Sequence, residues 1–185
     1  RRLRELQGAC AFMGHELVVL DGDDGGGARA GIQTGRDSDA IKTLIETERP
    51  QVVLVHHGKD WHPAHMLTNV IVLAVLDRMR WTGFSFESEY WRQMKEPNLM
   101  LEVTIPDFAV LLEALSFHKG ELARNPYHTR WPSLLCDNVR RAEVVFGRGS
   151  APPAFDYAAI YRRSACKNGT LTLMKPGFCW NRRLS

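Results

Sequence analysis

The sequence lacks any stretch long and apolar enough to cross a membrane, and it has few cysteines. Its most apolar run, residues 70–76, is far shorter than the roughly 20 residues that a membrane-spanning helix needs. The four cysteines among 185 residues form no CxxC pair, which argues against a disulfide framework and a cysteine-based metal site. No signal peptide is recognisable either. We therefore expect a protein of a reducing, cytoplasmic compartment with no membrane span.

An excess of charge of one sign is also absent. The net charge is +3 and the isoelectric point is about 8.8. Arginine pairs are scattered along the chain, at residues 1–2, 140–141, 162–163 and 182–183. Nucleic-acid-binding proteins more often cluster such charges on one element. We interpret the pairs mostly as solvated charges of helices and termini, with one or two reserved for an anionic ligand, and expect no nucleic-acid partner.

Composition and periodicity predict one α/β domain over residues 1–185. Hydrophobic residues make up 44% and charged residues 24%, which are ordinary globular values. Helices are predicted over residues 1–14, 38–48, 64–79, 106–122 and 133–146, and strands over residues 16–20, 51–55, 84–87, 99–105, 155–161 and 170–174. Strands that are apolar on both faces and alternate with helices indicate a three-layer, Rossmann-like domain with a mainly parallel sheet. Ligands of such sheets bind beyond the carboxyl ends of the strands, so the loops 21–36 and 56–63 are expected to carry the function.

The second of these loops is rich in histidine. Residues 56–65 contain four of the seven histidines and directly follow a buried strand. His62 and His65 are three residues apart at the start of a predicted helix and can face one cavity. Neutral imidazole is a common zinc ligand, and an adjacent histidine can serve as an acid. The spacing alone is loose, so a histidine-rich surface loop without metal is an alternative interpretation.

The order of motifs along the chain resembles the LmbE-like (PIG-L) zinc-dependent N-deacetylases. Residues 50–56 and 60–68 resemble that family's second signature, a strand followed by a His-Pro-Asp-His box and a helix. Residues 2–14, 20–26 and 114–119 are similar to its first helix, its acidic glycine turn and its late helix. Ala64 stands where the family has aspartate, and its first signature, a strand ending in Ala-His-Pro-Asp-Asp, has no counterpart. We expect the N-terminal strand and its metal-binding turn to be absent from this chain.

The resemblance implies a hydrolase that removes the N-acetyl group from an N-acetylglucosamine-containing conjugate with the help of Zn²⁺. His65 matches the zinc ligand of the second signature. His62 matches the residue that stabilises the oxyanion or protonates the leaving amine, and Asp60, its neighbour in sequence, is expected to hold that imidazole charged. The partner would be a small amino-sugar conjugate. The identity of this conjugate stays open, and so does whether the protein forms a homo-oligomer.

Four further residues are candidates for substrate binding, each with a structural alternative. Arg2 matches the family's arginine on the first helix, but it is equally explained as a solvated helix residue. Asp24 contacts a substrate hydroxyl or is an ordinary turn aspartate. Trp61 stacks on a sugar face or packs against the proline that follows it. For His118 a packed helix histidine is the simpler explanation.

Two rival functions are open at this point. A catalytically inactive relative could bind a sugar conjugate or a protein partner through the same pocket, which the absent first signature favours. A nucleotide-binding domain could use the glycine-rich loop 22–35. That loop contains neither GxGxxG nor a Walker-type Lys-Ser/Thr, which disfavours phosphate binding.

Overall fold

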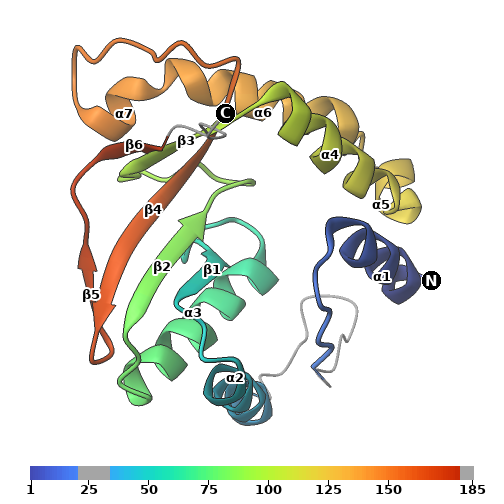
Figure 1. Ribbon diagram of the computed structural model, residues 1–185, viewed down its shortest axis with the longest axis vertical. Coiled ribbons are helices and arrows are strands. Elements are labelled where there is room, and N and C mark those ends of the chain that lie inside the picture. The colour runs from blue at the N-terminus through green and yellow to red at the C-terminus, as the bar shows by residue number, and fades with distance from the viewer. Residues whose placement is uncertain (21–33, 180–185) are drawn as a thin grey trace. The chain divides into compact units, whose positions relative to one another are not determined.

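The computed structural model describes residues 1–20 and 34–179 (Figure 1). The helices are α1 (Arg2–Met13), α2 (Thr34–Glu48), α3 (Pro63–Arg78), α4 (Ile105–Ser116), α5 (Lys119–Arg124), α6 (Tyr127–Arg140) and α7 (Ala142–Phe146). The strands are β1 (Val52–His56), β2 (Gly83–Ser88), β3 (Leu99–Val103), β4 (Tyr157–Lys167), β5 (Thr170–Leu173) and β6 (Gly177–Cys179). No helix among these residues is long and apolar enough to span a bilayer.

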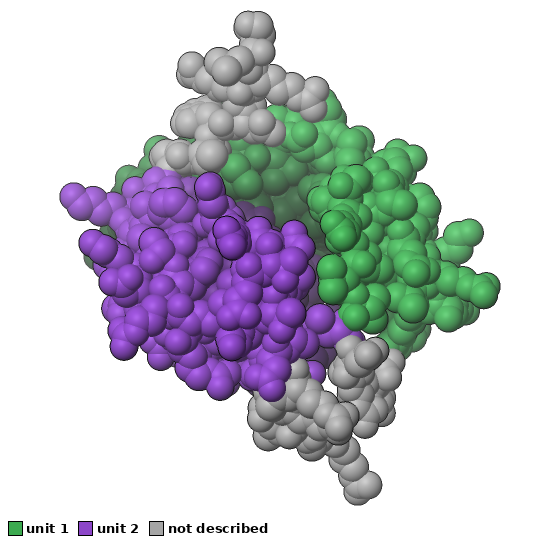
Figure 2. Space-filling model, turned by 60° about the horizontal axis from the view of Figure 1, so that its bottom comes forward, with its two compact units in different colours: residues 1–19, 100–159, 178–185 green, residues 20–99, 160–177 purple. Residues whose placement is uncertain are grey.

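The chain divides into two compact units, coloured separately in Figure 2. Unit 1 consists of residues 1–19, 100–159 and 178–185, and unit 2 of residues 20–99 and 160–177. Each unit is assembled from segments that are far apart in sequence. The expectation of a single domain over residues 1–185 stays a prediction.

Unit 2 contains a β–α–β element made by β1, α3 and β2. The strands β1 and β2 are parallel, with Val52 opposite Phe84 and His56 opposite Ser88. The strand β4 then runs antiparallel to β2, and β5 antiparallel to β4. The α/β fold class is confirmed, but the sheet is mixed rather than mainly parallel. Apolar residues on both faces show that a strand is buried, and they do not determine its direction.

The core of unit 2 joins two helices to one face of these strands. Ile45 of α2 and Val75 and Leu76 of α3 pack with Trp81 and Cys166 in one buried cluster. Helix α3 contacts β1, and α2 contacts α3 (Figure 1). This packing holds α3 beside β1.

A two-residue hairpin turn joins β4 to β5. Asn168 and Gly169 both have positive φ, at 50° and 82°, as a two-residue turn of this kind requires. A Cβ on Gly169 would lie 2.5 Å from the carbonyl oxygen of Asp77. Glycine is therefore needed at this position both for its conformation and for space.

Unit 1 is built from the remaining helices around a second core of Val103, Phe108 and Leu135. The helix predicted over residues 106–122 is two helices, α4 and α5, separated at Phe117 and His118. The side chain of Thr104 accepts a hydrogen bond from the Asp107 N–H and caps α4. The helix predicted over residues 133–146 begins earlier, at Tyr127, and ends at Arg140, where α7 follows after one residue.

One predicted strand is wrong. Residues 16–20 have no regular secondary structure, and Val18 and Val19 are about half exposed. The run of β-branched residues favours an extended chain, but a strand also needs a neighbour to complete its hydrogen bonds. No strand of the described chain pairs with this segment.

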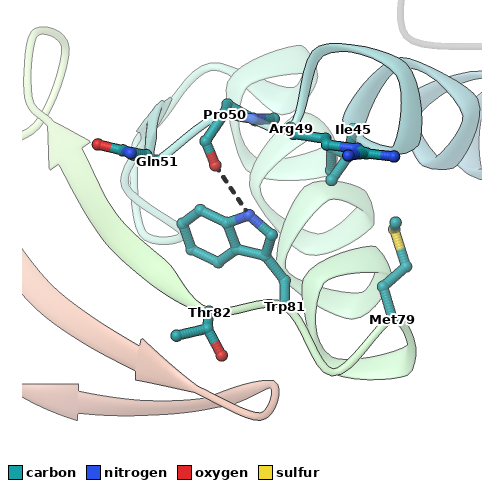
Figure 3. A pocket seen from close by; sticks show the side chains of 7 residues that line it. All are labelled: Ile45, Arg49, Pro50, Gln51, Met79, Trp81 and Thr82. Atoms are coloured by element: carbon teal, nitrogen blue, oxygen red, sulfur yellow. Dashed lines mark hydrogen bonds between the residues drawn. The ribbon is translucent and has the colours of Figure 1, made fainter.

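A shallow pocket of about 240 Å³ lies where β1 and β2 begin (Figure 3). It is lined by Ile45, Arg49, Pro50, Gln51, Met79, Trp81 and Thr82. Among these residues, the Trp81 indole N–H donates to the Pro50 carbonyl oxygen at 3.1 Å. The predicted functional loop follows the opposite ends of these strands.

Candidate functional site

The histidine loop joins the end of β1 to the start of α3. His56 is the last residue of β1, and His62 is the N-cap of α3 with an extended backbone, φ −81° and ψ 119°. Pro63 follows at the first helical position, where its missing N–H is not needed. The local sequence thus turns the chain from strand to helix at the carboxyl end of β1, as predicted.

Three imidazole rings gather at this turn. The rings of His56 and His65 are stacked, with centroids 3.6 Å apart and planes 9° from parallel. The His62 ring lies 4.6 Å from that of His65 and is tilted by 37°. His62 is exposed, and the other two are partly buried. The sequence placed His56 in the loop without a role, and the structure brings it against His65.

Burial holds two of these rings neutral at physiological pH. Desolvation lowers the pKa of His56, and the nearby Asp60 carboxylate opposes it only in part. Desolvation likewise lowers the pKa of His65, and the stacked ring of His56 adds to the effect. Neutral imidazoles are the form that binds metal ions or accepts a proton.

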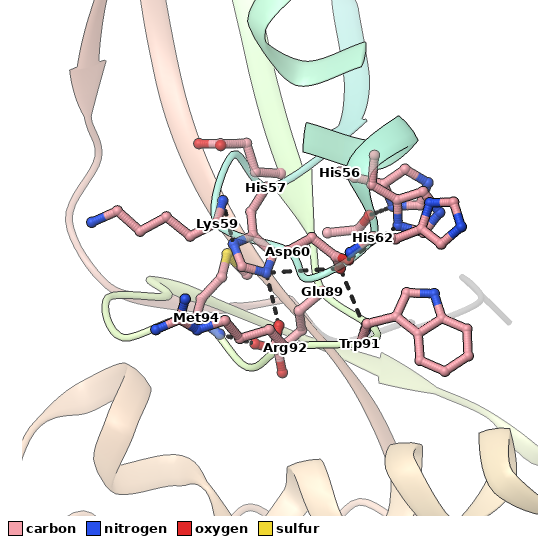
Figure 4. A network of polar contacts seen from close by, with 12 residues as sticks. His56, His57, Lys59, Asp60, His62, Glu89, Trp91, Arg92 and Met94 are labelled. Carbon is pink, nitrogen blue, oxygen red and sulfur yellow. Dashed lines mark hydrogen bonds and ion pairs between the residues drawn. The ribbon is translucent and has the colours of Figure 1, made fainter. Parts of the chain in front are cut away.

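Asp60 is the fully buried centre of the loop (Figure 4). Its Oδ1 accepts the backbone N–H of His62 at 2.8 Å, and its Oδ2 accepts that of Trp91 at 3.3 Å. Oδ1 also lies 3.4 Å from Nδ1 of His65. The expected partner was the His62 imidazole. The carboxylate instead bonds the His62 backbone, and it approaches two rings, that of His65 through Oδ1 and that of His57 through Oδ2 at 4.0 Å.

His57 fastens the histidine loop to the loop that follows β2. Its ring is buried, with Nε2 2.7 Å from the carbonyl oxygen of Arg92 and Nδ1 accepting the Lys59 N–H at 3.3 Å. This pairing assigns the proton to Nε2. The His57 N–H also donates to the carbonyl oxygen of Ser88. His57 is therefore a structural residue of the site.

A polar network lies behind the cluster, and the sequence analysis did not find it. Nδ2 of Asn69 donates to the His56 carbonyl oxygen at 2.8 Å and to Oε1 of Glu87 at 3.0 Å. Arg162 donates to the same carboxylate from Nε at 2.6 Å and Nη2 at 2.7 Å. The sequence signal for this network was Glu87 at the end of the apolar strand segment 84–87, because a carboxylate buried there needs a partner.

The interpretation of the arginine pairs as solvated charges is wrong for two residues. Arg162 lies within β4, directly opposite Glu87 on β2, and binds that carboxylate. The hydrogen bonds to Glu87 raise the pKa of Arg162 further. Arg141 is buried and donates to Oδ1 of Asn138 at 2.8 Å.

The four predicted substrate-binding residues fall in different parts of the chain. Trp61 is 70% exposed beside the histidine cluster. Arg2 and His118 belong to unit 1, where Arg2 pairs with Glu121 at 3.4 Å and His118 is the N-cap residue of α5. Asp24 lies outside the described residues. Their roles stay predictions.

The cluster offers part of a donor set for zinc. Nδ1 of His65 is buried and lies 3.4 Å from Oδ1 of Asp60, and a neutral imidazole of this kind suits zinc. However, residues 1–20 and 34–179 bring together no group of three or more His, Cys, Asp or Glu side chains that could hold a metal ion. A complete zinc site would need ligands from outside these residues.

Comparison with known proteins places the fold. No protein-family model and no curated protein matches the sequence. Three solved structures match the fold with TM-scores of 0.61, 0.61 and 0.58 and sequence identities of 15%, 17% and 15%. The chain has an LmbE-like fold.

The three structures come from different organisms. They are the conserved protein TT1542 from Thermus thermophilus, the 4-carboxy-2-hydroxymuconate hydratase from Pseudomonas putida and the N,N'-diacetylchitobiose deacetylase from Pyrococcus horikoshii. The matches cover 86%, 86% and 87% of this chain, and 70%, 69% and 62% of those chains respectively. At these identities the likeness shows the fold alone.

Proposed function

We propose that this chain is a hydrolase-type enzyme that removes the N-acetyl group from an N-acetylglucosamine-containing conjugate. The observation that carries the proposal is the cluster of His56, His62 and His65 around the buried Asp60 carboxylate. This cluster lies in the loop between β1 and α3, the segment that resembles the second signature of the LmbE-like deacetylases. A neighbour of the same fold, the chitobiose deacetylase of Pyrococcus horikoshii, is named for this chemistry.

His62 is suited to act on the substrate directly. It is exposed, and its backbone N–H is fixed by Oδ1 of Asp60 at 2.8 Å. A charged imidazole there would stabilise the oxyanion formed on the acetamide carbonyl and then pass its proton to the leaving amine. Water adds to the carbonyl carbon, forming a C–O bond, the amide C–N bond breaks, and the products are acetate and the free amino sugar.

His65 is suited to hold zinc. Burial lowers the pKa of its ring, and its buried Nδ1 lies 3.4 Å from Oδ1 of Asp60. Zinc, when bound, supplies the Lewis acidity that activates water at neutral pH. Asp60 holds the loop on which both histidines depend, through its bonds to the His62 and Trp91 N–H groups.

The exposed Trp61 would contact the sugar. It directly precedes His62 and presents its indole to solvent. An exposed tryptophan beside a reactive group provides a large apolar face on which a hexose ring can pack.

The test is release of acetate from N,N'-diacetylchitobiose and from a simple N-acetylglucosamine glycoside. The protein, supplied with zinc, should release acetate, and His62→Ala should lose about 100-fold or more in kcat, the loss typical of an acid–base residue. His128→Ala, which removes an exposed histidine of α6 in unit 1, is the matched control and should keep the activity. No acetate release from either substrate, or an equal loss in both variants, would refute the proposal.

A binding domain without activity is the second candidate. It is favoured by the finding that no three potential metal ligands come together in the described chain. In the presence of zinc, such a protein would bind the glycoside, as measured by titration calorimetry, but would release no acetate. Trp61→Ala would weaken that binding.

A further inference from the structure

We infer that Asn69 and Glu87 are positioning residues that set the place of the histidine cluster through the backbone of β1. Both act on the backbone of the element that carries one of the stacked rings. The inference rests on the proposed function, because the cluster is the place where the acetamide would react. It assigns a role to two side chains that the mechanism above does not use.

Asn69 ties together the two elements that bring the stacked rings. It lies four residues after His65 on α3, so the two side chains project from the same face of that helix. Its Nδ2 donates 2.8 Å to the carbonyl oxygen of His56, the last residue of β1. One hydrogen bond therefore fixes the end of β1 to the first turns of α3. The His56 and His65 rings stack across this junction.

Glu87 sets the orientation of the Asn69 amide. Its Oε1 accepts the second Nδ2 hydrogen at 3.0 Å. A carboxylate accepts and does not donate, so it keeps the NH₂ group of Asn69 turned toward both acceptors. The flipped amide would place Oδ1 against two oxygens and repel both.

Arg162 holds this acceptor in place. It donates to both carboxylate oxygens of Glu87, at 2.6 and 2.7 Å, from the neighbouring strand β4. Two parallel bonds to a planar guanidinium fix the plane of the carboxylate as well as its position. The chain of contacts thus runs from the sheet to the Asn69 amide and ends at the backbone of His56.

The histidine loop leaves room for this arrangement. A Cβ on Gly58 would lie 2.6 Å from Oδ1 of Asn69. Because this residue is glycine, the loop can pass close to the Asn69 side-chain amide while both N–H groups of that amide keep their hydrogen bonds.

The first readout is spectroscopic and does not depend on activity. Stacking at 3.6 Å places the ring protons of His56 and His65 in each other's ring-current field, which shifts their NMR signals upfield. In Asn69→Leu, measured without metal, these signals should move to the positions of unstacked histidines. The matched control is Asn138→Leu, because Asn138 is equally buried and bonds the Ala158 carbonyl in unit 1. Its variant should keep the shifted signals.

The second readout is kinetic. Misplacing reactive groups by about 1 Å can cost up to 100-fold in rate, so kcat of Asn69→Leu should fall by about 10- to 100-fold at a similar KM. The milder Asn69→Ser, whose side chain is too short to reach both acceptors, should show the same changes if Asn69→Leu does not fold. Ring signals that keep their upfield positions in a folded Asn69 variant would overturn the inference. Absence of acetate release by the unaltered protein would instead refute the proposed function, and the NMR comparison would still decide the positioning role.

Discussion

The ion pair of Arg162 and Glu87 yields a sharp stability prediction. Replacing Arg162 by Met removes both donors to a carboxylate that is 8% exposed and leaves it with the Asn69 amide alone. Removing one partner of a buried pair typically costs about 3–5 kcal/mol, because the remaining charge is uncompensated. The Arg162 side chain is 31% exposed, so water can reach the Glu87 carboxylate in the variant and offset part of this loss. We expect the free energy of unfolding to fall by about 2–3 kcal/mol.

The assay is urea unfolding followed by circular dichroism, with thermal unfolding as a second measure. For a chain of this length the melting temperature should fall by about 5–10 °C. Lys42→Met is the control, since Lys42 pairs with Glu46 at 3.6 Å on an exposed helix face, and it should cost less than about 0.5 kcal/mol.

A double variant completes the test. Glu87→Met together with Arg162→Met removes the stranded charge, and it should be more stable than Arg162→Met alone. A loss in Arg162→Met as small as that in Lys42→Met would refute the reasoning. A double variant no more stable than the single one would refute it too.

Two further predictions follow from the histidine stack and from one turn. Because burial lowers the folded-state pKa of His56 and His65 below the usual 6.5, the unfolded chain takes up protons first as the pH falls. Stability of the metal-free protein should therefore decrease below about pH 6.5, by at most about 1.4 kcal/mol per pH unit for each histidine, and urea midpoints of His65→Asn should show a flatter profile. Gly169→Ala should cost more than about 2 kcal/mol in urea unfolding, since its φ is 82° and its Cβ would meet the carbonyl oxygen of Asp77. Gly14→Ala, at φ 68° with open space around it, should cost only about 1 kcal/mol, and equal losses would contradict the argument from contact.

The sequence predicted the β–α–β element of unit 2 well. An apolar strand, a histidine loop and a helix starting at a proline are local signals, and β1 and α3 lie within one or two residues of the predicted bounds. The position of His62 and His65 beyond the carboxyl end of a strand follows from the same signals. The fold class follows from the alternation of elements.

The network behind the cluster could not be predicted in the same way. Glu87 and Arg162 are 75 residues apart and meet only because β2 and β4 pair in antiparallel register. An arginine pair in the sequence does not reveal which of its members faces a buried carboxylate. The segment 16–20 shows the reverse case, since its composition favours a strand and no described strand pairs with it.

The most direct test of the account is the metal dependence of acetate release from an N-acetylglucosamine glycoside. The protein is measured as purified, after removal of metal by a chelator, and after zinc is restored, with His65→Ala treated in parallel. The account predicts that chelation abolishes release, that zinc restores it, and that His65→Ala loses both activity and zinc. Acetate release that persists without metal, or that is unchanged in His65→Ala, would contradict it.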